Sequence, residues 1–181
     1  MPMNNSIDGS MQTLEQLICF IDDLNDTEYQ YSAKPWFNSS IGQHLRHIVD
    51  LYLALMNHNG LVDYDARRRG AAIESSRLVG LEELATIKQW LLSLDETNLN
   101  TDIRISTEVS LESQQALQFR STFARELCFA ASHLTHHLAI MAVIAKMSGH
   151  KVDASLGLAP ATATYVRNEM QQVEDTQPCV H

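Results

Sequence analysis

Glycine and proline are scarce in this chain of 181 residues, which has seven glycines and four prolines. Both residue types concentrate in turns, so their scarcity disfavours a sandwich of many short strands and favours helices. Hydrophobic residues make up 45% of the chain and charged residues 19%, which is ordinary for a globular protein. The length suffices for one domain with a substantial core, and we expect a single domain over residues 1–181.

Basic residues are also few, with 13 lysines and arginines against 22 aspartates and glutamates and a formal net charge of −9. A surface of that sign repels phosphate backbones and anionic lipid, so we expect no nucleic-acid partner. The short run Arg67-Arg68-Arg69 does not change this expectation, because three arginines in a loop are typical of a local ion-pair cluster or a solvated turn.

Cysteine is limited to three residues, and no Cys-x-x-Cys occurs. The odd number and the wide spacing argue against a disulfide framework or a zinc knuckle and suit a reducing compartment. Cys19 and Cys128 fall at apolar positions of predicted helices, where we expect small core residues. Cys179 lies close to His181 in a polar tail, which leaves two interpretations, a disordered terminus or a second metal site.

Targeting signals and long apolar runs are missing as well. The first residues show no basic stretch followed by an apolar one, so they do not resemble a secretory signal. The longest uninterrupted apolar run, Leu138–Ala145, is far too short to cross a bilayer. We therefore expect a cytoplasmic protein without a membrane partner.

Hydrophobic residues recur with helical periodicity in four long segments. The predicted helices are Met11–Leu24, about 40–58, roughly 74–94 and about 123–148. Ser10, Ser39 or Ser40, and Thr122 are the expected N-caps. We expect loops over 25–38 and Asn59–Gly70, and a short helix near 162–171.

Alternating apolar and polar residues at 103–109 and again at 117–120 predict a small β-hairpin. A two-stranded ribbon is not stable alone, so it must lie on the helices. Four helices of this length favour an all-α fold, a four-helix bundle with a small β-hairpin insertion. In such bundles, cofactor sites form between facing helices.

Five histidines on two of these helices are the most informative feature of the chain: His44, His47, His133, His136 and His137. His133 and His137 are four residues apart, so both imidazoles can reach one ion. A third histidine from the other helix would complete a site with open coordination positions, which is typical of a catalytic metal. The alternative is that the histidines are hydrogen-bonded structural residues of the core.

Other metal-site motifs are excluded by the residues present. A zincin needs Glu directly after the first histidine of His-x-x-x-His, and here that position is Leu134. A carboxylate-bridged di-iron bundle needs two Glu-x-x-His elements, and a zinc deaminase needs His-x-Glu with Pro-Cys-x-x-Cys. None of these patterns occurs in the sequence.

Three segments together resemble the DinB-like superfamily, four-helix bundles with a three-histidine metal site: 39–50 (SSIGQHLRHIVD), 62–69 (VDYDARRR) and 125–139 (RELCFAASHLTHHLA). The resemblance covers about residues 10–165, the expected core, and leaves a polar, flexible C-terminal tail. It implies a ligand seven residues after the serine that opens the second-helix motif. The step from Ser40 leads to His47, with His44 as the fallback.

The resemblance also assigns the other two ligands to His133 and His137. His136 falls on a flanking face, where we expect it to support the ligands or to pack in the core. The cofactor implied is one divalent metal ion, zinc or nickel by ligand type, although three imidazoles also accept iron, manganese or copper.

Characterised members of the superfamily imply a chemistry, because some are metal-dependent transferases or isomerases that use a low-molecular-weight thiol such as bacillithiol or mycothiol. A metal-bound thiol is deprotonated at neutral pH, and bound water activated in the same way gives hydrolysis. The expected function is therefore a metal-dependent thiol transferase or hydrolase acting on a small molecule, in a homodimer. The alternatives are a non-catalytic metal-binding or stress-response module and a dimeric scaffold whose histidines merely pack.

No general base is obvious, and Asp50 and Glu126 are the candidates. Each is also placed to orient a ligand imidazole. A further set shares the loop after the second helix: Tyr64, Asp65, Arg67 and Arg69. These residues either hold an anionic substrate near the site or pin the loop by Asp–Arg pairs, and we favour the pinning role.

Overall fold

The computed structural model of the protein describes residues 5–176. Its elements in chain order are α1 (Asn5–Asp23), α2 (Asp26–Gln30), α3 (Ile41–Met56), β1 (Leu61–Asp63), the 3-10 helix η1 (Ala72–Glu74), α4 (Arg77–Ser93), α5 (Glu96–Leu99), β2 (Asp102–Glu108), β3 (Ala116–Thr122), α6 (Phe123–Met147) and α7 (Pro160–Thr176).

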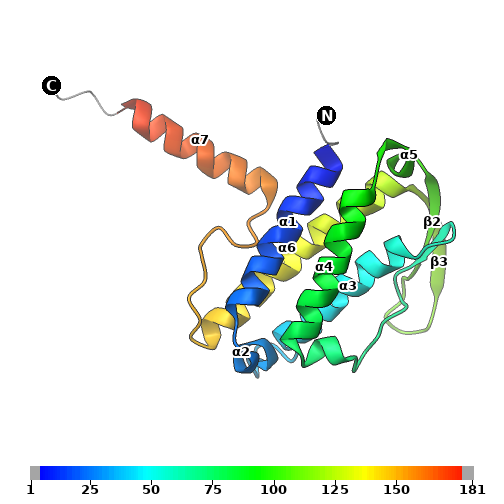
Figure 1. Ribbon diagram of the computed structural model, residues 1–181, viewed down its shortest axis with the longest axis horizontal. Helices are drawn as coiled ribbons and strands as arrows, with labels where there is room; N and C mark the ends of the chain where they lie inside the picture. Colours follow the sequence, from blue (N-terminus) through cyan, green and yellow to red (C-terminus); the bar gives the residue numbers. More distant parts are fainter. Residues whose placement is uncertain (1–4, 177–181) are drawn as a thin grey trace.

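The four predicted long helices are present as α1, α3, α4 and α6, and they lie side by side (Figure 1). Each packs against two others, because α1 and α3 both contact α6 and both contact α4. Apolar residues at helical spacing bury one face of each helix, as Leu14, Leu17 and Ile21 do on α1. Burial of these side chains dominates the favourable free energy of folding.

The prediction of an all-α fold is wrong. Three strands form a mixed sheet in the order β1-β2-β3, with β1 parallel to β2 and β2 antiparallel to β3. The predicted hairpin is present as β2 and β3, but β1 lies inside the predicted loop Asn59–Gly70. Strand β1 has three residues, which is too short for an alternating pattern to be recognised.

The extra strand has a structural role beside α3 and α6. Val62 of β1 is fully buried and pairs with Ile105 of β2. The backbone N–H of Tyr64 then donates to the carbonyl of Ser106 at 3.1 Å, so the strand pairing continues past β1. This register fixes the position of the Tyr64 side chain over α6.

Capping boxes set where the helices begin. The Ser40 hydroxyl accepts from the backbone N–H of Gln43, whose side chain accepts from the backbone N–H of Ser40. Ser40 and Thr122 are therefore N-caps as predicted. Ser10 is not an N-cap, because α1 starts earlier and Ser10 is buried inside the helix.

Short helices and cysteine burial account for the other differences from the sequence prediction. The predicted loop 25–38 contains α2, which starts with a capping box formed by Asn25 and Glu28. Cys19 and Cys128 are exposed rather than in the core, since each lies one position away from a residue of the buried stripe, Phe20 and Leu127 respectively. Cys179 and His181 lie outside the described residues.

Helix α6 is long and apolar enough to cross a membrane by length and composition. A single helix of this kind is a weak indication, because the core helix of a water-soluble protein has the same composition. Here α6 packs against both α1 and α3, which accounts for its apolar character within the fold. Its outer face is only partly covered, since Val143 is 45% exposed.

Helix α7 extends away from the four long helices (Figure 1). It includes the short helix predicted near 162–171 and lengthens it at both ends. Tyr165 and Met170 on α7 are mostly exposed. The polar tail is therefore helical as far as residue 176.

Gly42, in the first turn of α3, lets η1 approach that helix. A Cβ atom there would overlap the carbonyl oxygen of Glu74 and lie 2.7 Å from the Tyr29 ring. We expect Gly42→Ala to lower the free energy of unfolding by about 1–3 kcal/mol, because the rigid backbone of η1 must shift. Urea denaturation measures this change.

Gly9→Ala is the matched control, since a Cβ atom at Gly9 in α1 meets nothing within 4 Å. Alanine favours a helix over glycine by about 0.5–1 kcal/mol, so this variant should be unchanged or more stable. Equal losses in both variants would contradict the close approach of η1 to α3.

Candidate metal centre

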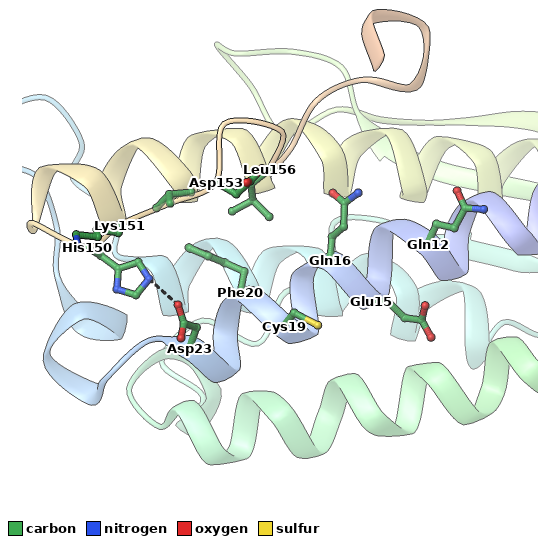
Figure 2. Close-up of a pocket in the computed structure, with 11 residues that line it drawn as sticks. Gln12, Glu15, Gln16, Cys19, Phe20, Asp23, His150, Lys151, Asp153 and Leu156 are labelled. Atoms are coloured by element: carbon green, nitrogen blue, oxygen red, sulfur yellow. Dashed lines mark ion pairs between the residues drawn. The ribbon is translucent and has the colours of Figure 1, made fainter. Parts of the chain in front are cut away.

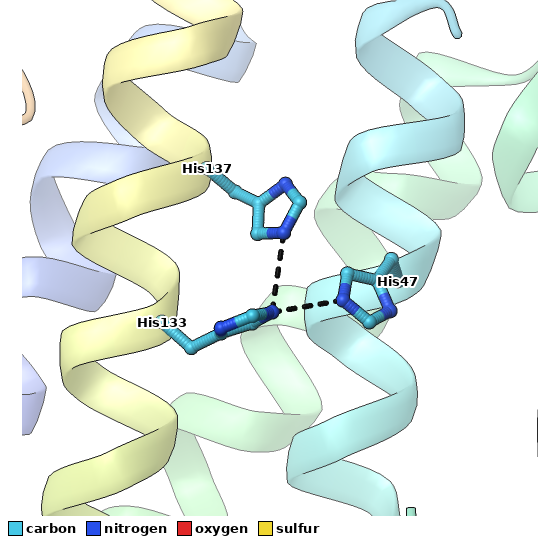
Figure 3. Close-up of side chains that lie close together, drawn as sticks. All are labelled: His47, His133 and His137. Carbon is cyan, nitrogen blue, oxygen red and sulfur yellow. Dashed lines mark hydrogen bonds between the residues drawn. The ribbon is translucent and has the colours of Figure 1, made fainter. Parts of the chain in front are cut away.

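Three histidines from two helices converge between α3 and α6 (Figure 3). His47 lies on α3, and His133 and His137 lie one turn apart on α6. The Nε2 atom of His133 is 2.9 Å from Nε2 of His47 and 3.1 Å from Nε2 of His137. The three rings thus direct their Nε2 atoms toward one point, as we predicted from the histidines of the two helices.

This donor set fits a metal ion. Nitrogen ligands about 2.0–2.1 Å from a tetrahedral ion lie roughly 3.3 Å from one another, close to the two separations measured from His133, and all three ligand atoms lie within 4.8 Å of one another. In neutral imidazole one ring nitrogen carries the proton and the other has a free lone pair, so three Nε2 lone pairs are available to one cation. The His47, His133 and His137 group can therefore hold a metal ion.

Burial keeps the ligand imidazoles neutral, which is the form that binds metal. It lowers the pKa of His47 to about 4, assisted by the positive charges of Arg67 and Arg46 and by the repulsion that would arise if His133 were protonated as well. It lowers the pKa of His137 to about 3, with further contributions from the neighbouring histidines. The pKa of His133 is also lowered, first by burial and then by His136 and Arg67.

His44, the fallback ligand, lies beside the triad rather than in it. Its Nδ1 atom is 3.0 Å from Nδ1 of His137, the ring nitrogen that does not face His133. A hydrogen bond there fixes the orientation and the tautomer of the His137 ring. His136 is exposed, and its ring centroid is 5.3 Å from that of His137.

Asp50 is fully engaged in holding the arginine-containing loop, so it is not free to accept a proton in the site. Its Oδ1 atom accepts from Nε of Arg68 at 2.6 Å, and its Oδ2 atom accepts from the backbone N–H of Arg68 at 3.0 Å. Arg46, one turn earlier on α3, donates to the same Oδ2 at 3.2 Å. Arg68 also pairs with Glu83 of α4 at 2.7 Å.

The loop after β1 is therefore pinned to α3 by an Asp–Arg pair, the role that we favoured for its residues. The arginine of that pair is Arg68, which is outside our predicted set. Asp65 contributes by a different contact, because its Oδ2 atom accepts from the backbone N–H of Glu108 at 2.6 Å. Arg67 and Arg69 form no ion pair or hydrogen bond within residues 5–176, and both are exposed. A triplet of identical residues gives no sign of which arginine turns inward, so the sequence could not single out Arg68.

Glu126, the second candidate base, is completely buried on α6, two turns before His133. Its Oε2 atom accepts from the hydroxyl of Tyr64 at 2.7 Å. Its Oε1 atom accepts from the hydroxyl of Ser121 at 2.6 Å and from Nη1 of Arg125 at 2.8 Å. Burial and this carboxylate together raise the pKa of Tyr64, so its hydroxyl stays protonated.

Two cavities flank the triad. One of about 560 Å³ is lined by His137 and His47, together with Arg67 and Arg69. The other, of about 300 Å³, is lined by the following residues: His47, Leu51, Tyr64, Arg67, Ile105, Thr107, Arg125, Glu126, Phe129 and His133. His47 and Arg67 line both, so the triad lies between two spaces of substrate size.

A larger cavity, of about 720 Å³, lies elsewhere, between α1 and the segment after α6 (Figure 2). His150 at its edge pairs with Asp23 at 3.2 Å and with Glu28 at 3.1 Å. Both imidazole nitrogens are thus used to hold the chain after α6 against α1 and α2. Size alone does not make this cavity a catalytic site, since its one histidine is already paired with two carboxylates.

Comparisons with known proteins leave the family of the chain open. A protein named FK506-binding protein 5 from Rhizopus delemar is 28% identical over 109 residues, which is 60% of this chain. The match spans only 28% of that protein's length, so the chain corresponds to about a quarter of it. No family model matches the chain, and no solved structure matches it.

The network around Asp50 predicts a large loss of stability on its removal. We expect Asp50→Asn to lower the free energy of unfolding by about 3 kcal/mol, because buried Arg46 loses one of its two carboxylate partners and Arg68 loses its pairing with α3. Asp22→Asn is the control, since Asp22 pairs with Arg77 at the surface and should change stability by less than about 1 kcal/mol. Similar losses in both would contradict the anchoring role of Asp50.

The lowered pKa values of His47 and His137 predict a pH dependence in the metal-free protein. An unfolded chain takes up protons on these imidazoles near their model value of 6.5, whereas the folded chain does so only near 4 and 3. Stability from these groups is therefore present above about pH 6.5 and is lost as pH falls toward 4. Urea midpoints of chelator-treated protein should decrease over that range.

His137→Asn should make that decrease shallower, because a titrating group is removed. His136→Asn is the comparison on the same helix, because this exposed imidazole is only the last-ranked contributor to the lowered pKa of His137 and its removal should change the pH dependence less than His137→Asn does. An equal pH dependence in wild type and His137→Asn would contradict the assignment of the shift to His137.

Proposed function

We propose that this protein is a metal-dependent enzyme that acts on a small molecule, as a thiol transferase or a hydrolase. The observation that carries the proposal is three imidazole nitrogens facing one point between two cavities. Three protein ligands leave coordination positions free, which distinguishes catalytic zinc sites from closed structural ones. A cavity on each side gives a substrate access to those positions.

His47, His133 and His137 would hold the ion, which we propose to be zinc or nickel because neutral imidazole suits both. When bound, a divalent ion supplies Lewis-acid chemistry and lowers the pKa of a coordinated thiol or water. The protein contributes the rest, since burial keeps the ligands neutral and His44 orients His137.

Tyr64 and Glu126 are the groups best placed to handle protons in the smaller cavity. The Tyr64 hydroxyl donates a hydrogen bond to the Glu126 carboxylate. When the tyrosine oxygen takes a proton from a substrate, the tyrosine can pass its own proton to Glu126. Ser121 and Arg125 hold the carboxylate in place for this transfer. Between the two predicted bases we favour Glu126, because it lines the cavity beside the triad and accepts from a hydroxyl that can transfer a proton, whereas Asp50 accepts only from arginine side chains and a backbone N–H.

Membership of the DinB-like superfamily is part of the proposal, on the strength of the three motifs and the convergence of their histidines. A low-molecular-weight thiol would then be the co-substrate of a transferase, and water that of a hydrolase. The homodimer and the cytoplasmic location stay predictions.

The alternative function, a non-catalytic metal-binding or stress-response module, predicts a fourth protein ligand or a site without a neighbouring cavity. Within residues 5–176, the group of potential ligands contains three histidines and no fourth member. Both neighbouring cavities have the size of a small-molecule site. These two observations support the enzyme over the module.

Metal content tests the proposal most directly. Untagged wild-type protein, purified after growth with varied metal supply, should contain one ion per chain by elemental analysis. His47→Ala, His133→Ala and His137→Ala should each lose most of it, because two imidazoles bind far more weakly than three. Wild-type protein should also lose thermal stability when a chelator removes the ion.

His136→Ala is the matched control, since this exposed imidazole is on α6 but outside the triad. It should keep its ion and its response to chelator. The proposal fails if wild-type protein holds no stoichiometric metal under any supply, or if His136→Ala loses metal as the triad variants do.

A further inference from the structure

We infer that the substrate is an acidic small molecule whose oxyanion group is a carboxylate or a phosphate. Arg67 and Arg69 bind this group in the larger of the two cavities beside the triad, of about 560 Å³, while an apolar part of the molecule occupies the smaller one, of about 300 Å³. This inference rests on the proposed function, because it assigns the substrate class of that same site. It starts from the three consecutive arginines, which the structure separates into two roles.

Arg68 forms ion pairs within the protein, whereas its neighbours Arg67 and Arg69 form none within the described residues. Its side chain pairs with Asp50 and Glu83, and its backbone N–H also binds Asp50. Arg67 and Arg69 both line the larger cavity and have no acidic partner in the part of the chain that the structure describes. Pinning by the middle arginine thus holds two unpaired guanidinium groups at the mouth of the metal centre.

The larger cavity is positive although the protein is acidic. Three arginines and one glutamate line it, and that glutamate, Glu74, accepts from Nε of Arg46 at 3.0 Å. Two guanidinium charges are left over, in a chain whose formal net charge is −9. Guanidinium groups bind carboxylate and phosphate with paired, charge-assisted hydrogen bonds, so an oxyanion is the ligand that this cavity selects.

The smaller cavity has a different lining. Leu51, Ile105 and Phe129 give it apolar walls, and the negative charge of its buried carboxylate, Glu126, is balanced by the ion pair with Arg125. The Phe129 ring stacks on the His133 ring, with centroids 5.5 Å apart and an interplanar angle of 29°. An apolar group in this space would therefore lie against the triad.

Arg67 lines both cavities, and its positive charge acts on His47 and His133. A molecule with an oxyanion at one end and an apolar group at the other can span the triad, with its central atoms next to the three histidines. Neither a neutral apolar molecule nor a cation uses the two unpaired arginines.

Binding of simple probes tests the inference without an assay of catalysis. The probes are 3-phenylpropionate, its neutral amide 3-phenylpropanamide, and inorganic phosphate, each titrated calorimetrically into full-length protein. We expect the phenylpropionate to bind about tenfold or more tightly than the amide, which has the same shape but no charge. Comparison with phosphate tells which oxyanion the arginines prefer.

Arg67→Gln and Arg69→Gln should each weaken binding of the preferred oxyanion by about fivefold or more and leave the amide unchanged. Arg167→Gln removes the same charge from α7, which extends away from the four long helices (Figure 1), and Arg167 lines neither cavity beside the triad, so the affinity of this variant should equal that of wild type. Both loop arginines are exposed, and unchanged melting temperatures would verify that the variants fold.

The inference is overturned if the acid and the amide bind equally, if neither phenylpropionate nor phosphate binds, or if Arg67→Gln and Arg69→Gln keep wild-type affinity for both oxyanions. Each titration is made on metal-loaded and on chelator-treated protein, which separates this result from the metal proposal. Arginine-dependent binding in a protein that never holds metal leaves the anion site standing alone. Stoichiometric metal without arginine-dependent binding overturns only the anion site.

Discussion

The buried carboxylate of Asp50 is the interaction on which the candidate site depends. It lies on α3 one turn after Arg46 and receives hydrogen bonds from that side chain and from both the side chain and the backbone of Arg68. A charge buried in this way is tolerated only when several donors compensate for the lost water. The compensation is what ties a surface loop to the helix that carries His47.

Several features of the site follow from that tie. The hydrogen bonds of Arg68 hold the loop between β1 and η1 in place against α3, so Arg67 and Arg69 line a cavity instead of facing solvent alone. Burial, assisted by the positive charge of Arg67, keeps the pKa of His47 far below its ordinary value. An acidic protein thereby keeps neutral imidazoles and positive charge together in one region, a combination suited to a cation and an anion as joint ligands.

Features set by residues close together in the sequence could be predicted, whereas features that depend on contacts between distant residues could not. His133 and His137 were recognisable because helical spacing is local, whereas the choice of His47 over His44 came from the family resemblance, through the step of seven residues from Ser40. The third strand was missed, since Leu61–Asp63 is stabilised by pairing with residues more than 40 positions later. The role of Arg68 was missed for a similar reason, because its partners Asp50 and Glu83 belong to other elements.

The long sequence separations within the site have a consequence for how it arises. His47 meets His133 across 86 positions, and Tyr64 meets Glu126 across 62. Closing such large loops costs entropy that only the packed helices and the parallel strand pair can offset. A nascent chain therefore cannot bring the three histidines together until α6 has been synthesised and has packed against α3, so an ion held by this group would bind the folded protein and not the unfolded chain.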